Sequence, residues 1–169
     1  MRIKRWFNVI IVFSSLLCAH NRFDSVSLEV IFLPESQASI YKELESAIDT
    51  ARSSVMVAMY WLTYDPFIHK LIELRKKNVD VQVVLDGSMF ANFQNVSNIV
   101  TLLNKSDIYP LILPSKQINR GIMHNKFIVI DNKTVWTGSA NFTKAALDSG
   151  NDYLNDENIL IINIIISGI

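Results

Sequence analysis

The chain has 169 residues, of which 50% are hydrophobic and 19% are charged, and its 16 basic residues balance 16 acidic ones. This composition excludes a disordered chain, and the length fits one domain with a substantial core. Proteins that grip nucleic acid through many phosphate contacts are usually basic. Since this chain is not, an anionic ligand would have to be bound by a local site.

The first 19 residues have the layout of an export signal. Arg2, Lys4 and Arg5 precede the apolar run WFNVIIVFSSLLCA, which is short for a bilayer span. We therefore expect residues 1–19 to be a signal peptide of an exported (periplasmic or secreted) protein, with an uncleaved membrane anchor as the alternative. Cleavage would leave 13 basic and 16 acidic residues and would remove Cys18, the only cysteine, so no disulfide or thiolate site is expected.

Beyond residue 26, short β-branched runs alternate with segments whose apolar residues recur at helical spacing. We expect helices over 36–52, 65–78, 93–105 and 141–147. We expect strands over 27–34, 54–62, 79–87 and 108–113, then a hairpin within 123–142 and a last strand over 157–166. Asp65 is expected to cap the second helix, with Pro66 in its first turn. The alternation predicts an α/β fold, a mixed sheet flanked by helices, in one domain over 27–169.

The hairpin MHNKFIVIDNKTVWTGSANF carries polar residues at both ends. His124 and Lys126 are two apart, so they would share a face of the first strand. Ser139 and Asn141 follow the second strand, and we expect Asn141 to begin a helix. An ammonium, an imidazole, a hydroxyl, an amide and free helix N–H groups are suited to holding phosphate oxygens. The histidine would then act as nucleophile or acid.

Each of these residues alone has an ordinary structural interpretation as a surface histidine, a solvated lysine, a turn residue or a helix cap. Their joint spacing favours a functional interpretation. The pattern H-x-K-x4-D-x6-G-S-x-N runs through His124, Lys126, Asp131, Gly138, Ser139 and Asn141. It resembles the signature of the phospholipase D superfamily. The order of segments from residue 27 to 166 is similar to its small single-motif members, which include bacterial exported endonucleases and mitochondrial cardiolipin hydrolase.

The resemblance implies hydrolysis of a phosphodiester through a covalent phosphohistidine, without a cofactor or metal. His124 would be the nucleophile, and Lys126 and Asn141 would bind the non-bridging oxygens. Ser139 would support that site and bind phosphate, and Glu157 would orient the imidazole.

The remaining motif residues have supporting roles. Asp131 and Gly138 would lie behind the site, and a role in the hairpin turn is equally expected for Asp131.

The mechanism needs two histidines, and of His20, His69 and His124 only the last lies in a motif. The resemblance therefore implies a symmetric homodimer that shares one active site. It also implies a C-terminal helix after the last strand, whereas this sequence stops at IISGI.

The sequence leaves the substrate open between nucleic acid and phospholipid. A catalytically inactive module that binds phosphate, nucleic acid or lipid is a further alternative. Several large side chains would either line an apolar mouth beside the site or pack in the core: Tyr60, Trp61, Met89, Phe90 and Phe93.

Overall fold

The computed structural model describes residues 25–33, 40–92, 96–113, 121–148 and 155–165. The chain divides into two units, Ser27–Asn163 and a second one that combines Met1–Val26 with Ile164–Ile169. The first unit contains the sheet, the helices and the candidate site. The predicted signal peptide, His20 and Phe93 lie outside the described residues. No helix in the described part of the chain is long and apolar enough to cross a membrane.

Strands and helices alternate in the described residues as the sequence predicts. The strands are β1 (Ser25–Phe32), β2 (Ser54–Met59), β3 (Asp80–Asp86), β4 (Leu111–Leu113), β5 (Lys126–Ile130), β6 (Thr134–Gly138) and β7 (Asn158–Ile165). The helices are α2 (Ile40–Asp49), α3 (Asp65–Lys76), α4 (Met89–Asn92), α5 (Val96–Lys105) and α6 (Lys144–Leu147).

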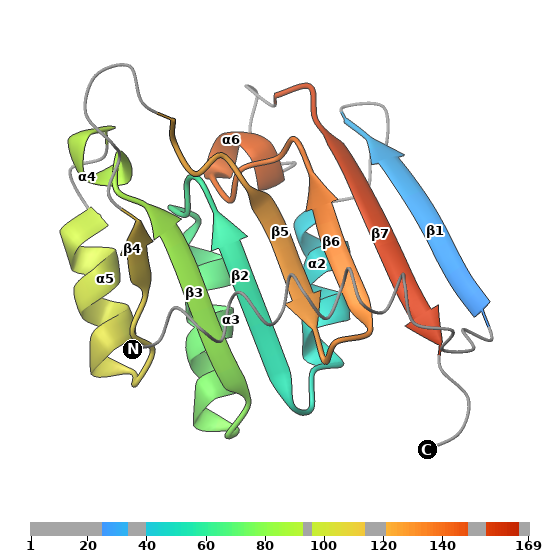
Figure 1. Cartoon of the computed structure of the whole chain (residues 1–169), viewed down its shortest axis with the longest axis horizontal. Helices are drawn as coiled ribbons and strands as arrows, with labels where there is room; N and C mark the ends of the chain where they lie inside the picture. The colour runs from blue at the N-terminus through green and yellow to red at the C-terminus, as the bar shows by residue number, and fades with distance from the viewer. Residues whose placement is uncertain (1–24, 34–39, 93–95, 114–120, 149–154, 166–169) are drawn as a thin grey trace. The chain divides into compact units, whose positions relative to one another are not determined.

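The strands form one mixed sheet in the order β1-β7-β6-β5-β2-β3-β4 (Figure 1). β2, β3 and β4 are parallel neighbours, as expected for strands joined by helical crossovers. β5 joins β2 in antiparallel pairing, and β6 and β7 continue the sheet in the same way. The predicted α/β fold with a mixed sheet is confirmed. The sheet places the ends of β2, β5 and β6 side by side, where the polar motif residues lie.

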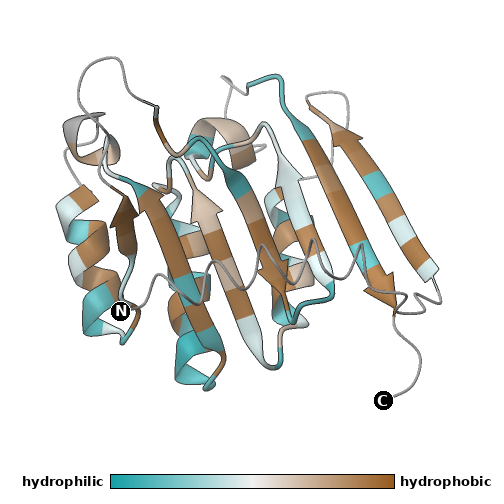
Figure 2. Cartoon of the chain, viewed as in Figure 1, coloured by the Kyte–Doolittle hydropathy of each residue, from teal (hydrophilic) through white to brown (hydrophobic). Residues whose placement is uncertain are grey.

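A hydrophobic core joins the sheet to α2 and α3. Hydrophobic residues dominate β2, β3 and β5 (Figure 2). In α2 the apolar positions four apart, Ile40, Leu44 and Ile48, are all buried, as an amphipathic helix requires. Val57 and Phe67 are fully buried in the same cluster. Burying each such side chain contributes about 1.5–3 kcal/mol, so this packing fixes the strands that carry the site.

The β5–β6 hairpin closes with the tight turn that the sequence indicates. Asp131 and Asn132 have φ angles of 50° and 55°, and the Lys133 N–H donates to the Ile130 carbonyl over 2.9 Å. Two successive residues of positive φ define the turn type whose twist matches a β-hairpin, and Asp and Asn tolerate that conformation. The turn fixes the pairing of Phe127 with Thr137, and hence the register of the whole hairpin.

Several predicted boundaries were wrong. Asp65 is the first residue of α3, Tyr64 occupies the cap position, and no side-chain cap hydrogen bond forms there. The predicted first helix ends at Asp49 rather than at residue 52, whereas the second ends at Lys76 with Lys77 as its C-cap, close to the predicted stop. The strand expected to reach residue 62 ends at Met59, and the N–H groups of Thr63 and Tyr64 donate to the Phe142 carbonyl instead.

The elements flanking the hairpin also differ from the prediction. The strand expected over 108–113 begins only at Leu111, after Pro110, which cannot donate to a strand ladder. The short helix expected from Asn141 begins at Lys144. α4 forms a separate turn of helix ahead of α5.

Candidate active site

Lys126 is the first residue of β5 and one of the few buried charged residues among those described, with 8% of its surface exposed. Its Nζ donates a 3.0 Å hydrogen bond to the His124 carbonyl and lies 5.2 Å from the centre of the Tyr60 ring. Burial lowers the pKa of Lys126, against the opposing attraction of the Glu157 carboxylate. Among the described residues no carboxylate forms an ion pair with Lys126. Within the described residues its hydrogen-bond acceptor is thus a neutral backbone carbonyl.

His124 lies in the segment just before β5, not in the strand as the sequence predicted. Its side chain is exposed, and its ring makes an edge-on contact with Tyr60, with 4.7 Å between ring centres. The Tyr60 N–H donates to the Asn125 carbonyl over 2.8 Å, which continues the β2–β5 pairing past the end of both strands. Tyr60 thus contacts both the imidazole and the Lys126 ammonium, and it brings them to one place.

Asn141 reaches the same place from the other arm of the hairpin. Its side-chain Oδ1 accepts the Trp61 N–H at 3.3 Å, and the next residue, Phe142, donates its own N–H to the Trp61 carbonyl at 3.0 Å. This hydrogen bond orients the amide so that the Nδ2 donor points away from Trp61. Because α6 begins three residues later, Asn141 contributes its side chain rather than a helix N-terminus.

Ser139 and Glu157 form a hydrogen-bonded pair where β6 meets β7. The Ser139 hydroxyl donates to Glu157 Oε2 at 2.5 Å and accepts the Asn158 N–H at 2.9 Å. The Ser139 N–H donates to the Asn158 carbonyl. Asn155 donates to the other oxygen of Glu157 over 3.1 Å. The Glu157 carboxylate is thus held by Ser139 and Asn155.

The structure does not join Glu157 to His124. No hydrogen bond between them occurs within the described residues, because the β6–β7 register sets Glu157 beside Ser139. Glu157 still influences the site, since its charge acts on Lys126. The predicted role of Glu157 in orienting the imidazole has no hydrogen bond to support it here.

Gly138 is required by close packing at this point. A Cβ atom on Gly138 would lie 2.0 Å from the Asn158 carbonyl oxygen, far inside any tolerable contact. The glycine therefore lets β7 approach the end of β6 and carry Glu157 to Ser139.

Asp131 lies at the opposite end of β5 from Lys126, away from the other motif residues. Its carboxylate accepts hydrogen bonds of 2.8 Å from the backbone N–H groups of Arg52, Ser53 and Ser54 and from the Ser53 hydroxyl. Burial opposes ionisation, but these donors outweigh it and lower the pKa of Asp131. The contacts of Asp131 agree with the alternative interpretation, in which it anchors the hairpin turn to the start of β2.

The large side chains near the site divide between core and surface. Met89 is fully buried and Trp61 packs against the core, so neither forms an open mouth. Phe90 is 46% exposed, and Ile122, which the sequence analysis did not single out, is 48% exposed. Asp86, which the sequence pattern does not indicate as a site residue, is a buried carboxylate whose Oδ2 accepts the N–H of Met123 at 2.7 Å.

Lys126 and His124 both contact Tyr60, and Asn141 bonds to the next residue, Trp61. The three side chains offer a buried ammonium, an exposed imidazole and an amide, groups that in general can bind phosphate oxygens or supply a nucleophile. No group of three metal-ligating side chains occurs within the described residues. His69, the other described histidine, is exposed on α3. The protein is thus an α/β protein whose mixed sheet carries these side chains where β2 ends and β5 begins.

Comparison with known proteins identifies the family. Residues 44–164 match the family described as "Cardiolipin synthase, PLD-like domain". Because this match covers most of the chain, the protein belongs to the phospholipase D superfamily. It is 33% identical over 131 residues to a phospholipase D of Rickettsia bellii, covering 78% of this chain and 58% of that protein. It is 30% identical over 134 residues to the mitochondrial cardiolipin hydrolase of Mus musculus, with 76% and 52% covered. The chain thus spans little more than half the length of these curated relatives.

Solved structures agree with the family assignment. The fold is similar to that of NucT from Helicobacter pylori, with a TM-score of 0.69, 26% identity and coverage of 82% of this chain and 86% of that one. It is also similar to a phospholipase D family member, Nuc from Salmonella typhimurium, with a TM-score of 0.65, 31% identity and coverage of 83% and 85%. The confirmed fold is therefore phospholipase D-like.

Proposed function

We propose that this protein is a phosphodiesterase that hydrolyses its substrate through a covalent phosphohistidine on His124. The observation that carries the proposal is Lys126, a buried ammonium without an ion pair among the described residues, bonded to the backbone of an exposed histidine. Burying a charge is costly unless it is compensated. A substrate phosphate would supply the missing counter-charge, and Asn141 would donate a second hydrogen bond through its Nδ2.

The chemistry proceeds in two displacements. An imidazole nitrogen of His124 attacks phosphorus, a P–N bond forms, and the P–O bond to the leaving group breaks. A second imidazolium protonates the leaving oxygen. Water then attacks phosphorus, the same second imidazole accepts its proton, and the P–N bond breaks to release a phosphomonoester. Lys126 and Asn141 stabilise the charge on the non-bridging oxygens in both steps.

The second imidazole is proposed to come from His124 of another copy of the chain. The other described histidine, His69, lies on α3 away from the motif, and His124 is exposed and open to a partner. A symmetric dimer would therefore hold one site with two copies of His124.

Subunit mixing tests the dimer. When wild-type protein exchanges subunits with His124→Ala protein, activity should fall as the square of the wild-type fraction, because only dimers with two histidines react. A linear fall, or a fully active monomer in sedimentation, would contradict the shared site.

Two kinds of substrate are considered, and a phospholipid is the favoured one. The curated relatives are named phospholipase D and mitochondrial cardiolipin hydrolase, which favours a phospholipid. The exposed side chain of Ile122, two residues before His124 in the chain, offers apolar surface that agrees with that choice. A nucleic acid is the alternative. Parallel assays on cardiolipin, phosphatidylcholine, single-stranded DNA, duplex DNA and RNA separate the two.

The central experiment replaces His124 with alanine. His124→Ala should abolish hydrolysis of bis(p-nitrophenyl) phosphate and of the preferred natural substrate, because no nucleophile remains. The exposed position predicts an unchanged melting temperature. His69→Ala, on the exposed face of α3, is the matched control and should keep full activity. Retained turnover in His124→Ala would exclude the mechanism, and loss of wild-type activity in EDTA that a divalent ion restores would exclude its metal-free form.

Export of the protein is also a proposal, and it rests on the sequence of residues 1–19. Fractionation of cells that express the full chain, with mass spectrometry of its N-terminus, would distinguish a cleaved signal peptide from an uncleaved anchor.

A further inference from the structure

Asp86, the last residue of β3, has a carboxylate buried at the edge of the candidate site. Only 1% of its surface is exposed. Its two oxygens accept hydrogen bonds from different parts of the chain. Oδ1 accepts the N–H of Ser88 at 2.8 Å, which closes the turn after β3. Oδ2 accepts the N–H of Met123 at 2.7 Å, across 37 residues of sequence.

The second bond reaches the residue that precedes His124. The backbone around His124 has three anchors: the Met123 N–H bonds to Asp86, the His124 carbonyl to Lys126, and the Asn125 carbonyl to the Tyr60 N–H. β5 begins only at Lys126, so the strand ladder itself does not fix His124. Asp86 is the anchor on the N-terminal side.

We propose that Asp86 is a positioning residue that sets the placement of the His124 imidazole, an inference that rests on the proposed role of His124 as nucleophile. Turn closure after β3 needs only the bond to Ser88. The bond to Met123 ties the nucleophile's own backbone to the rigid centre of the sheet. Hydrogen bonds from backbone N–H groups to a charged carboxylate are among the strong ones, so this anchor is stiff. A nucleophile displaced by about 1 Å can lose about 100-fold in rate.

Asp86→Asn tests this role with little change in side-chain volume. An amide offers one acceptor oxygen and one NH2 donor, so it cannot accept both N–H groups. The Met123 amide should lose its protection from hydrogen exchange, or the Ser88 amide should lose its own. If Met123 is released, kcat on bis(p-nitrophenyl) phosphate should fall by about 10- to 100-fold while KM changes little, because misplacement affects the reaction more than binding.

Two further variants keep the test decisive. Met123→Pro removes the donor and leaves Asp86 intact, so it should lower kcat by the same factor even if Asp86→Asn releases Ser88 instead or fails to fold. Val81→Ala, a buried position on the same strand that pairs with Val55 of β2, is the control for general loss of stability. Measured well below its melting temperature, it should keep its kcat.

The outcomes separate this inference from the proposed function. Suppose that Asp86→Asn removes the hydrogen-exchange protection of the Met123 amide but its kcat equals that of Val81→Ala. Asp86 then has no positioning role, and the same follows if the Met123 amide is unprotected in the wild type. If the wild type hydrolyses no phosphodiester, the proposed function fails and NMR decides the inference. Release of the Met123 N–H should then shift the ring resonances of His124, whereas Val81→Ala should leave them unchanged. If release of Met123 also leaves them unchanged, the positioning role is overturned.

Discussion

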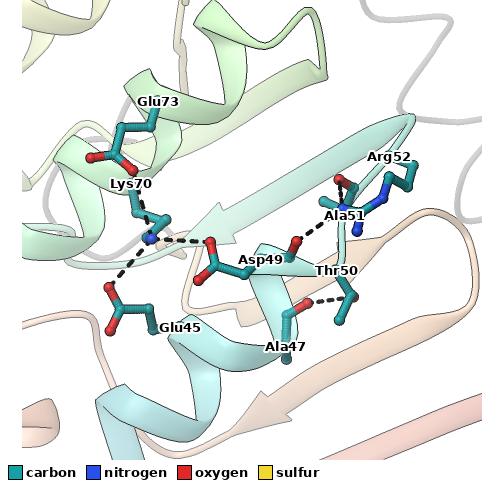
Figure 3. A network of polar contacts seen from close by, with 8 residues as sticks. All are labelled: Glu45, Ala47, Asp49, Thr50, Ala51, Arg52, Lys70 and Glu73. Carbon is teal, nitrogen blue, oxygen red and sulfur yellow. Dashed lines mark hydrogen bonds and ion pairs between the residues drawn. The ribbon is translucent and has the colours of Figure 1, made fainter.

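Two lysines in the described part of the chain have largely buried side chains, but only one of them forms ion pairs with described residues. The side chain of Lys70, on α3, is 13% exposed and links α3 to α2 (Figure 3). Its Nζ lies 3.0 Å from Asp49, 3.4 Å from Glu45 and 3.6 Å from Glu73. Lys126 has the His124 carbonyl and the face of the Tyr60 ring, and no ion pair with any described residue.

The pKa values of the two lysines move in opposite directions. Burial acts to lower the pKa of Lys70, but hydrogen bonds and attraction from Asp49 and Glu45 outweigh it and raise the pKa. At Lys126 burial prevails over the attraction of Glu157, and the pKa falls. The charge of Lys70 is therefore neutralised within the fold. The charge of Lys126 has no carboxylate partner among the described residues, as the proposed phosphate-binding role requires.

The largest effect expected from this comparison is on catalysis. Lys126→Met removes the ammonium and keeps a side chain of similar length, so kcat/KM should fall by at least about 100- to 1,000-fold, as for other transition-state donors. Lys70→Met, a chemically identical change in the helical layer, should keep its kcat. Steady-state kinetics on one phosphodiester substrate measure both. Equal losses in the two variants would show that Lys126 acts through the fold.

The stabilities should follow the reverse order. Lys70→Met leaves three carboxylates without their common cation and should lower the free energy of unfolding by about 1–2 kcal/mol, more than an exposed ion pair. Lys126→Met removes a buried charge that forms no ion pair with a described residue, so it should be neutral or stabilising. Urea unfolding at pH 7 tests both, and a destabilised Lys126→Met protein would contradict the comparison.

The pH dependence sharpens this difference. Lys70 has a pKa raised above its unfolded value of 10.5, so its contribution to stability is complete below that pH and is lost as the pH rises through the folded pKa. Lys126 has a pKa lowered from 10.5, so the cost of its charge disappears as the pH rises from the folded pKa toward 10.5. In alkaline solution the difference in the free energy of unfolding between the wild type and each variant should therefore shrink. The wild type should lose its advantage over Lys70→Met, and Lys126→Met should lose any advantage over the wild type.

The sequence predicted the parts of the site that depend on local pattern. Alternation and turn residues predicted the β5–β6 hairpin, which places Lys126 at the start of one arm and Asn141 just after the other. It did not predict where β5 begins. The strand starts at Lys126, and His124 is held through hydrogen bonds of its two neighbours. The Met123 N–H donates to the Asp86 carboxylate, and the Asn125 carbonyl accepts the Tyr60 N–H.

Contacts between distant segments were not predictable from one sequence. Lys70 stands in HKLIELRKK among other charged residues, and nothing local indicates that α2 brings two carboxylates to it. Asp86 ends an apolar strand in VVLDG and has the pattern of a turn residue. Its hydrogen bond to Met123 depends on the path of the chain after β4. The Glu157–Ser139 pair likewise depends on the β6–β7 register.

The smallest effect on activity is expected at Asp131. Like the ammonium of Lys70, its carboxylate has its partners within the fold. Asp131→Asn replaces one acceptor oxygen with a donor that faces backbone N–H groups, so it should lower the free energy of unfolding by about 1 kcal/mol and affect kcat far less than Lys126→Met. Because its folded pKa lies below 3.8, the stabilisation is complete above that pH and is lost as the pH falls through the folded pKa. The difference in the free energy of unfolding between Asp131→Asn and the wild type should therefore be largest near neutral pH and disappear in acid. A kcat as low as that of Lys126→Met would place Asp131 in the catalytic site rather than in the turn.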